Sequence, residues 1–420
     1  MREMKDSGIE WIGKVPVEWK IDNPQYHFSQ RKDRAKQGMV QLTASQKYGV
    51  ITQTEYMERT GANIVTVQKD FDILKLVCAG DFVIHMRSFQ GGLEYSEKTG
   101  SISSAYVMLI PSNTIREPRY YKWFFKSSNY IDALSSTSNL VRDGQAMRWS
   151  NFIQLPILFP PAEEQQRIAD FLDAKCAEID ALTADIQTQI DTLEQYKRSV
   201  ITETVTKGLN PDAKMKDSGI QWIGNMPAHW DVIRGKYILR YMQKPVREDD
   251  GVITCFRDGE VTLRSNRRED GFTMSDKEIG YQGIDVGDLV VHGMDGFAGS
   301  IGISNSRGKA SPVLNVLDTD QCKRYIMYYL RSMAYSDVFL ALATGIRVRS
   351  CDLRWNKLAE LSYPVPPLDE QNAIVKHIDS VLSKADAVIA DKKAQLATLD
   401  EYKKSLIFEY VTGKKEVPTS

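Results

Sequence analysis

A ten-residue segment occurs twice in this chain of 420 residues. MKDSGIEWIG occupies residues 4–13, and MKDSGIQWIG occupies residues 215–224 with a single difference. The match extends to residues 4–20 and 215–231, which agree at eleven of seventeen positions. A second pair of segments, 193–206 and 399–412, agrees at eight of fourteen. The chain is therefore a tandem duplication of a unit of about 200 residues, whose ends stayed alike while its middle diverged.

Two segments predict unusually long helices. Residues 162–206 and 368–412 each run for 45 residues without a glycine or proline. A Pro-Pro pair precedes each segment and suits a helix start, and Gly208 and Gly413 lie just past the other ends. At 1.5 Å per residue, each helix reaches roughly 65 Å, which is longer than a single domain needs.

Apolar residues recur along both segments at the three-and-four spacing of a coiled coil. The expected seam consists of Leu172, Ile179, Leu182, Ile186, Leu193 and Val200 in the first segment, and of Ile378, Ala385, Val388, Leu396, Leu399 and Leu406 in the second. Lys392 interrupts the second stripe. We expect the two helices to pair antiparallel and to leave wide acidic outer faces.

The divergent middles predict mixed α/β domains. GDFVIHMRSF (80–89) and GDLVVHGMDGF (287–297) are apolar strands after a Gly-Asp turn, and 105–110 and 311–317 suit later strands. Each middle then has an aromatic helical stretch, 119–132 or 324–337, and closes with an Arg-Trp pair. The predicted fold class is α+β, with two such domains separated by the long helices in a pseudo-twofold arrangement. A constant scaffold with variable loops is how binding specificity diversifies.

The charge distribution separates the regions. The net charge is −1, but residues 1–159 hold 20 Lys and Arg against 16 Asp and Glu, and residues 210–365 hold 21 against 20. The helical segments 162–206 and 368–412 carry −6 and −2. An acidic surface binds phosphate poorly and suits a protein partner. Scattered cysteines without a CxxC pair, and the lack of a signal peptide or membrane span, favour a reduced, cytoplasmic protein.

No catalytic motif is evident. The sequence contains no GxGxxG after a strand, no adenine-methyltransferase motif and no P-loop, since GKA at 308–310 lacks the upstream glycine and the Ser or Thr. The five histidines are isolated, so no metal site is expected. We expect no catalysis by this chain alone.

The order of the motifs resembles the specificity subunit of type I restriction–modification enzymes. Each repeat opens with SGIxWIGxxPxxW, resumes with PPxxEQ before its helix, and ends the helix with YKxSxI. The resemblance covers residues 4–412 and departs only at Lys392. It implies a first target-recognition domain at 1–159, a conserved helix at 160–209, a second target-recognition domain at 210–365, and a second helix with the C-terminal tail at 366–420.

The resemblance also implies function and partners. Each target-recognition domain would read one half of a bipartite, asymmetric site in double-stranded DNA, and the helices would bind two modification subunits. In such complexes the modification subunits methylate adenine N6 with S-adenosylmethionine, and restriction subunits use ATP and Mg for translocation and cleavage. The specificity subunit would bind no cofactor itself. Helix length would set the gap between half-sites, much as dimer geometry sets half-site spacing.

Basic and amide side chains in the predicted loops are the candidates for DNA contact, because they pair with guanine, adenine or phosphate. They are Arg31, Lys32, Arg34, Arg87, Gln90 and Arg142 in the first half, and Arg264, Asn266, Arg267, Arg268, Arg347 and Arg349 in the second. Each of them can equally be a solvated surface charge.

Two other functions are compatible with parts of the sequence. A self-sufficient DNA-modifying enzyme would need a site that its motifs do not reveal. A coiled-coil scaffold without a nucleic-acid role would leave two basic, loop-divergent domains unexplained.

Overall fold

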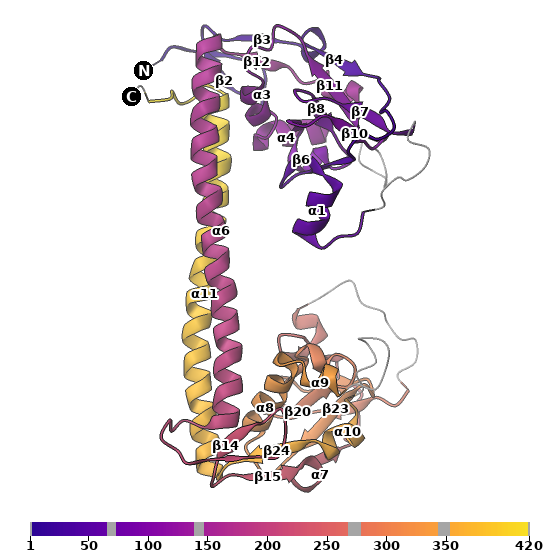
Figure 1. Cartoon of the computed structure of the whole chain (residues 1–420), viewed down its shortest axis with the longest axis vertical. Coiled ribbons are helices and arrows are strands. Elements are labelled where there is room, and N and C mark those ends of the chain that lie inside the picture. Colours follow the sequence, from indigo (N-terminus) through magenta and orange to yellow (C-terminus); the bar gives the residue numbers. More distant parts are fainter. Residues whose placement is uncertain (1, 65–72, 138–146, 268–278, 343–352, 419–420) are drawn as a thin grey trace. The chain divides into compact units, whose positions relative to one another are not determined.

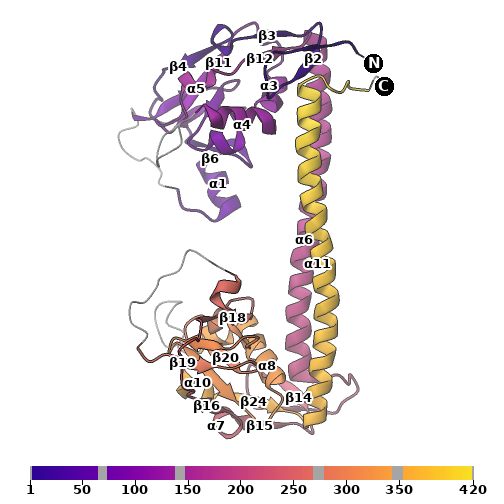
Figure 2. The ribbon, with the colours of Figure 1, turned by 180° about the vertical axis from the view of Figure 1, so that it is seen from behind.

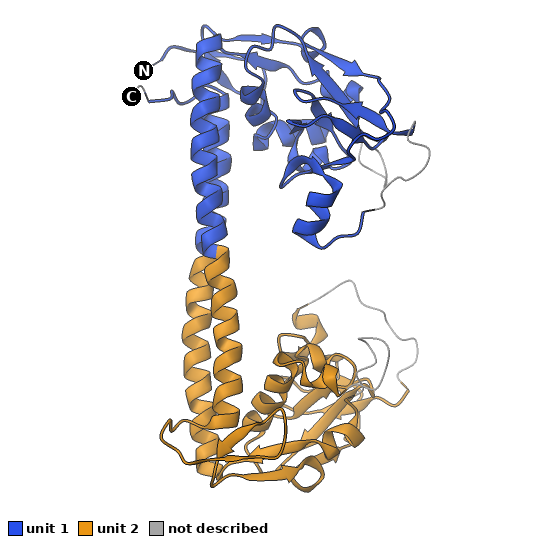
Figure 3. Cartoon of the chain, in the orientation of Figure 1, with its two compact units in different colours: residues 1–186, 394–420 blue, residues 187–393 orange. Residues whose placement is uncertain are grey.

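A computed structural model describes residues 2–64, 73–137, 147–267, 279–342 and 353–418. The chain divides into two compact units: residues 1–186 with 394–420 form unit 1, and residues 187–393 form unit 2 (Figure 3). Each unit therefore joins the α/β domain of one repeat to part of its own helix and to part of the helix from the other repeat. The domain borders expected from the sequence fall at other residues than the borders of these two units, and they stay a prediction.

Two long helices are present where the sequence predicts them (Figure 1). Helix α6 spans Ala162–Lys207, with 46 residues, and α11 spans Leu368–Val411, with 44 residues. Acidic residues occupy the first turn of both, where the helix dipole is positive. Gly208 and Gly413 follow the two helix ends with φ of 74° and 67°, a left-handed conformation that glycine adopts without strain.

The domain of unit 1 is built on a four-stranded antiparallel sheet in the order β4-β11-β8-β9. Its strands are β1 Met4–Asp6, β2 Lys14–Pro16, β3 Lys20–Asp22, β4 Phe28–Arg31, β5 Leu42–Ser45, β6 Gly49–Thr52, β7 Lys75–Val77, β8 Phe82–Ile84, β9 Glu94–Tyr95, β10 Gly100–Ile102, β11 Val107–Pro111 and β12 Ile157–Phe159. Its helices are η1 Pro24–Tyr26, α1 Gln53–Thr60, α2 Ser88–Gly91, α3 Pro118–Phe124, α4 Ser128–Ser136 and α5 Trp149–Phe152.

The domain of unit 2 has the same sheet order, β16-β23-β20-β21. Figure 2 shows the ribbon from behind. The strands of this domain are β13 Met215–Asp217, β14 Asn225–Pro227, β15 Asp231–Arg234, β16 Arg240–Met242, β17 Ile253–Cys255, β18 Val261–Leu263, β19 Gln282–Ile284, β20 Leu289–His292, β21 Ile301–Ile303, β22 Gly308–Ala310, β23 Leu314–Asp318 and β24 Ser362–Val365. Its helices are α7 Gly235–Ile238, η3 Arg264–Asn266, η4 Gly296–Ala298, α8 Lys323–Tyr335, α9 Val338–Ala341 and α10 Trp355–Glu360.

The aromatic stretches differ between the units in one respect. In unit 2 the stretch forms one helix, α8, as predicted. In unit 1 it is divided into α3, which ends at Phe124, and α4, which begins at Ser128. Phe82, Tyr121 and Phe125 then pack edge-on or tilted around Phe28 in the core below the sheet.

The seam between the long helices is buried, but two predicted seam residues lie outside it. Of the predicted set, Leu172, Ile179, Ile186, Ile378, Ala385 and Leu406 are buried, and Leu193, Val200, Leu396 and Leu399 are half-buried. Leu182 and Val388 are 47% and 45% exposed, so their assignment to the seam is wrong.

The spacing of the buried residues explains this error. In α6 the buried residues Cys176 and Ile190 lie four residues after the heptad positions Leu172 and Ile186. Leu182, in contrast, lies three residues after Ile179. In α11 the buried partner of Ala385 likewise lies four residues later, at Ile389, whereas Val388 lies three residues after Ala385. Lys392, which interrupts the stripe, donates from Nζ to the Gln189 Oε1 atom within unit 2.

The repeated opening motif ties the ends of the two helices together in each unit. In unit 1, Trp19 is fully buried and donates from Nε1 to Glu164 Oε2 at 2.9 Å, near the start of α6. A Cβ on Gly413, just past α11, would lie 2.5 Å from Pro16 and 2.9 Å from the Trp19 ring. Glycine is therefore needed at this position, and the opening motif contacts both helices.

Unit 2 repeats the packing of this junction with the helix ends exchanged, but Trp230 Nε1 has no hydrogen-bond partner among the described residues. A Cβ on Gly208, just past α6, would lie 3.1 Å from the buried Trp230 ring and 3.3 Å from Glu370 near the start of α11. Two buried tyrosines complete the pattern. Tyr120 donates to the Val411 carbonyl at 2.7 Å in unit 1, and Tyr325 donates to the Val205 carbonyl at 3.0 Å in unit 2. The matched segments, together with Tyr120 and Tyr325 from the divergent middles, thus hold each domain on the helix pair.

Candidate nucleic-acid interface

Arg31, the first predicted DNA-contact residue, is engaged inside its own domain. It lies at the end of β4 and donates to both carboxylate oxygens of the buried Asp81, at 2.7 and 2.9 Å. This bidentate pair raises the pKa of Arg31 above its usual range. Asp81 also accepts from the Cys78 backbone at 2.8 Å. An arginine held in this way positions the β4–β8 sheet and has little freedom to reach a base.

The other candidates in the first domain are on the surface. Lys32 and Arg34 are exposed just after β4, and Arg34 donates to the Ile73 carbonyl at 3.1 Å. Arg87 and Gln90 are exposed at α2, beside the cavity-lining residue Gln46, whose side chain donates to the Arg87 carbonyl at 3.0 Å. These four side chains are free of internal ion pairs in the described part of unit 1, so they remain accessible to phosphate or bases.

The candidates in the second domain gather after the β17–β18 hairpin, around η3. Arg267 pairs with Asp258 at 2.7 Å and with Glu260 at 3.2 Å, and its guanidinium lies 4.2 Å from the Phe256 ring centroid. Arg264 donates to Thr254 and Asn266 donates to Thr262, at 3.2 and 2.8 Å. These residues form one polar edge of the domain, in which Arg267 is already paired with carboxylates.

Four predicted residues lie outside the described part of the chain: Arg142, Arg268, Arg347 and Arg349. Their role in DNA contact stays a prediction.

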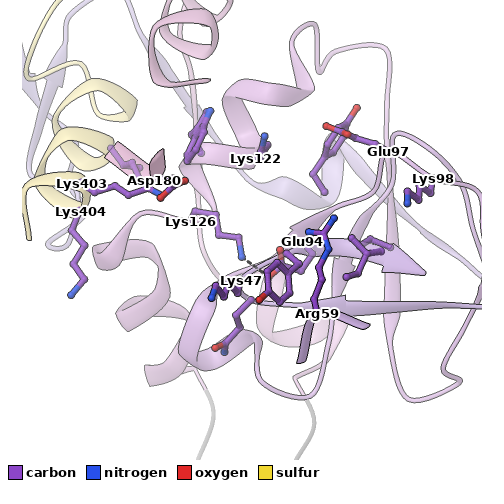
Figure 4. A pocket seen from close by; sticks show the side chains of 18 of the residues that line it. Lys47, Arg59, Glu94, Glu97, Lys98, Lys122, Lys126, Asp180, Lys403 and Lys404 are labelled. Atoms are coloured by element: carbon purple, nitrogen blue, oxygen red, sulfur yellow. Dashed lines mark hydrogen bonds and ion pairs between the residues drawn. The ribbon is translucent and has the colours of Figure 1, made fainter. Parts of the chain in front are cut away.

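A cavity of about 630 Å³ lies in unit 1 between the domain and the helix pair (Figure 4). Its basic lining residues are Lys47, Arg59, Lys98, Lys122, Lys126, Lys403 and Lys404, against the acidic Glu94, Glu97, Asp180 and Asp400. Several of these charges are neutralised locally: Lys126 pairs with Glu94, and Lys403 pairs with Asp180 at 2.5 Å. The lining nevertheless keeps an excess of positive charge.

Two basic residues of this cavity lie beside Tyr48. This tyrosine lies in the turn between β5 and β6, and Lys47 Nζ and Arg59 Cζ each lie 5.2 Å from its ring centroid. Arg59 comes from α1, whose start is fixed by a capping box between Thr52 and Glu55. Two cations beside an aromatic ring are suited to phosphate and to the face of a base.

Unit 2 contains an equivalent cavity of about 590 Å³. Besides Leu382, its helix lining consists of Glu194, Lys197, Arg198, Ile201 and Asp386, which are the repeat counterparts of Asp400, Lys403, Lys404, Ile407 and Asp180 in unit 1. The domain contributes Arg257 and Arg331 instead of the lysines of unit 1, and Arg198 lies 5.3 Å from the Tyr335 ring centroid. The helix side of the cavity is thus retained between the repeats, while the domain side differs.

Sequence reasoning missed the domain residues of both cavities. Lys47, Arg59, Lys122 and Lys126 are spread over eighty residues, and only the fold brings them to one surface. The signal that was present is the basic pair in the repeated helix motif, Lys197-Arg198 and Lys403-Lys404.

Within the described ranges, His, Cys, Asp and Glu side chains do not form a group of three or more that could hold a metal ion. None of the described helices is long and apolar enough to cross a membrane. The arrangement supplies basic and aromatic surface for binding an anionic polymer.

Comparison with known proteins gives consistent matches. Residues 27–192 match the family described as type I restriction modification DNA specificity domain. The chain is 22% identical over 422 residues to the type I restriction enzyme MjaVIII specificity subunit of Methanocaldococcus jannaschii, covering 96% of this chain and 94% of that one. It is 22% identical over 332 residues to the EcoBI specificity subunit of Escherichia coli, covering 71% and 67%.

A solved structure has the same fold. A chain from work on complex assembly and conformational transition of the type I restriction–modification system superimposes with a TM-score of 0.64 and 14% identity, over 96% of this chain and 99% of that one.

Proposed function

The chain belongs to the specificity-subunit family of type I restriction–modification enzymes, and on this premise we propose that it selects the DNA sequence on which such a complex acts. Each domain reads one half of a bipartite, asymmetric site in double-stranded DNA. The long helices dock two modification subunits and set the spacing between the half-sites. A specificity subunit supplies recognition, so the chain is the non-catalytic component.

The observation that carries this proposal is the repeated junction between domain and helix pair. Three pairs of residues occupy equivalent places in the two units: Trp19 and Trp230, Gly413 and Gly208, and Tyr120 and Tyr325. The domains held by these junctions share a sheet order but differ in the residues of their loops and cavities. A protein that reads two different half-sites requires two different domains on one common support.

The basic cavities support contact with the DNA backbone. Phosphate contacts fix the register of a protein on a duplex and outnumber base contacts in protein–DNA interfaces. The residues around Tyr48 in unit 1 and the edge around η3 in unit 2 are suited to this role. The candidates for base or phosphate contact in the first domain are the exposed residues Lys32, Arg34, Arg87 and Gln90. Arg31 is no longer a candidate, because it is paired with Asp81.

The cofactors and the cellular place follow from the same premise. The chain itself binds no cofactor. The modification subunits use S-adenosylmethionine, and a restriction subunit, where the system has one, uses ATP and Mg. Because DNA is the substrate, the complex acts in the cytoplasm.

Methyl transfer by purified components tests the proposal. The chain alone, supplied with DNA and S-adenosylmethionine, should incorporate no methyl groups. The chain with its modification subunit should methylate adenine at one bipartite sequence, and the modification subunit alone should not. Methylation by the rigorously pure chain, or sequence-independent methylation by the assembled complex, would refute the assignment.

A further inference from the structure

Three residues that line the unit 2 cavity have counterparts in unit 1 with different partners. In unit 2 they are Arg198 of α6 with Arg331 and Tyr335 of α8, which we call the arginine–tyrosine cluster, and their unit 1 counterparts are Lys404, Lys126 and Tyr130. Both sets descend from one repeat unit. A charge that is neutralised in one unit serves packing there, whereas the same charge without a partner in the other unit is available to a ligand.

Both basic side chains of the unit 1 set are neutralised within that unit. Lys126 pairs with Glu94, which is buried. Lys404 pairs with Asp400 at 2.8 Å and with Glu401 at 2.9 Å on its own helix. The two lysines therefore have little charge left to attract an anion.

The tyrosine position separates the units as well. Tyr130 is fully buried in unit 1 and packs edge-on against Trp11. Tyr335 is half-buried in unit 2 and lines the cavity. The Cζ atoms of Arg198 and Arg331 lie 5.3 and 5.7 Å from its ring centroid. The ring thus holds two guanidinium groups at one place on the cavity wall.

The two arginines of the cluster are not neutralised. Arg331 donates from Nε to the Tyr335 hydroxyl at 2.8 Å and from Nη2 to the Asp258 carbonyl at 2.7 Å, and both acceptors are uncharged. Arg198 is exposed and contacts the Tyr335 ring. Within the described ranges, neither guanidinium forms an ion pair with a carboxylate. Because a guanidinium has five N–H donors in a planar fork, both retain donors that match the oxygens of a phosphate.

The other basic residues of the cavity are paired. Lys197 pairs with Glu194 at 3.0 Å and with Asp386 at 2.6 Å. Arg257 pairs with Asp295 at 3.1 Å. The available positive charge of the cavity is therefore concentrated in the arginine–tyrosine cluster.

Asp258 connects the cluster to the polar edge around η3. Its carboxylate pairs with Arg267 of that edge at 2.7 Å, and its carbonyl accepts from Arg331 at 2.7 Å. A duplex presents a row of phosphates along each strand, whereas a free phosphate fills one position. The continuity from the edge to the cluster therefore favours a DNA backbone over a free phosphate.

We propose that Arg198, Arg331 and Tyr335 form a phosphate-binding site for the DNA backbone, and that α6 thereby contacts DNA in addition to carrying the domain. This inference rests on the proposed function and adds to it a contact from the support itself. The equivalent positions of unit 1 are described and are used internally, so the two units hold DNA unequally.

The salt dependence of DNA binding by the full-length chain with its modification subunit tests this inference. Arg198→Gln and Arg331→Gln should each weaken binding to cognate and unrelated duplexes alike and leave the methylated bases unchanged. Each should also reduce the slope of log K against log salt by about 0.9, so that its deficit shrinks about 3-fold between 50 and 200 mM salt. Thermal unfolding checks the fold, and Arg198→Gln, at an exposed residue, keeps the test independent of stability.

Arg240→Gln is the matched control. It removes the same charge from unit 2, but Arg240 is neutralised by Asp318 and Asp320 at 2.9 and 2.7 Å. Its slope should equal that of the wild type.

Asp337 provides a test in the opposite direction. Its carboxylate lines the cavity, and it has no ion-pair partner in the described part of unit 2. Its φ of 55° is a left-handed conformation that asparagine also tolerates. Asp337→Asn should therefore tighten DNA binding without straining the backbone.

The outcomes separate this inference from the proposed function. If Arg198→Gln and Arg331→Gln keep the wild-type slope while the wild-type complex still methylates one bipartite sequence, the phosphate site is refuted and the proposed function stands. A change in the methylated bases would mean that the cluster reads sequence, which also overturns the site. Protection of the wild type against thermal unfolding by inorganic phosphate at constant ionic strength, lost in Arg198→Gln and with no effect on the DNA slope, would assign the cluster to a free phosphate instead. Failure of the wild-type complex to select a sequence would refute the proposed function itself.

Discussion

Lys197 of α6 and Asp386 of α11 form an ion pair at 2.6 Å within unit 2. Its repeat counterpart, Lys403 of α11 with Asp180 of α6, is present in unit 1 at 2.5 Å. All four residues are identical between the repeats. The Lys side chains are the less exposed members, at 18% and 26%, so these pairs fix the register of the antiparallel helices at the edge of the seam.

Charge reversal tests this pairing. Lys197→Glu should destabilise the protein by about 1 kcal/mol, because it places a carboxylate beside Asp386 and Glu194. Adding Asp386→Lys should recover part of that loss. Thermal unfolding of the two single variants and the double variant measures the coupling. Additive effects in the double variant would show that the pair contributes nothing to register.

The buried tyrosines at the domain–helix junctions should be sensitive to loss of one hydroxyl. Burial raises the pKa of Tyr120 and Tyr325 well above the usual range, so both remain neutral donors. Tyr120→Phe and Tyr325→Phe should each cost about 1–2 kcal/mol, because a buried helix-end carbonyl loses its donor. Denaturant unfolding gives the loss, and Tyr237→Phe, at a residue 74% exposed, should change nothing. Unchanged stability in both junction variants would contradict this role.

Residues near the two ends of the described chain contact each other within unit 1, which predicts tolerance of circular permutation. Arg2 Nε lies 3.8 Å from Glu416 Oε1, and Lys414 Nζ donates to the Ile12 carbonyl at 2.6 Å. Joining the ends by a short flexible linker and opening the exposed segment between Pro211 and Asp212 should leave both junctions intact. Circular dichroism and thermal unfolding should match the wild type. A permutant opened between Tyr120 and Tyr121 should not fold, and equal behaviour of the two permutants would argue against this reasoning.

Helix length should determine the gap in the recognised site. Inserting seven residues into α6 and seven into α11 at equivalent positions keeps the heptad pattern and adds about 10 Å of helix, equivalent to about 3 base pairs. Methylation mapping should show a longer gap and unchanged bases. A change in base identity without a change in the gap would contradict the prediction.

The sequence predicted the long helices correctly because glycine and proline are absent and the flanking Pro-Pro and glycine positions are strong local signals. It predicted the sheet strands β8, β11, β20 and β23 because they are short apolar runs after turns. It misassigned Leu182 and Val388, because the helix packing buries the positions four residues after Ile179 and Ala385, whereas these two apolar residues lie three residues after them. The DNA-contact candidates were the least predictable part. Arg31 pairs with Asp81, fifty residues away, and such a partner cannot be read from local pattern.

Exchange of one domain tests the central claim, that two independent readers share one support. The structure places the scaffold strands β3 and β12 at Lys20–Asp22 and Ile157–Phe159, where they pair with each other, so the exchanged segment should run from residue 23 to residue 147. The donor segment must keep a tyrosine at the place of Tyr120, which contacts the end of α11. Methylome mapping of cells carrying the chimaera with its modification subunit is the measurement. Only one half-site should change, while the other half-site and the gap stay as in the wild type. A change in both half-sites, or in the gap, would contradict the account.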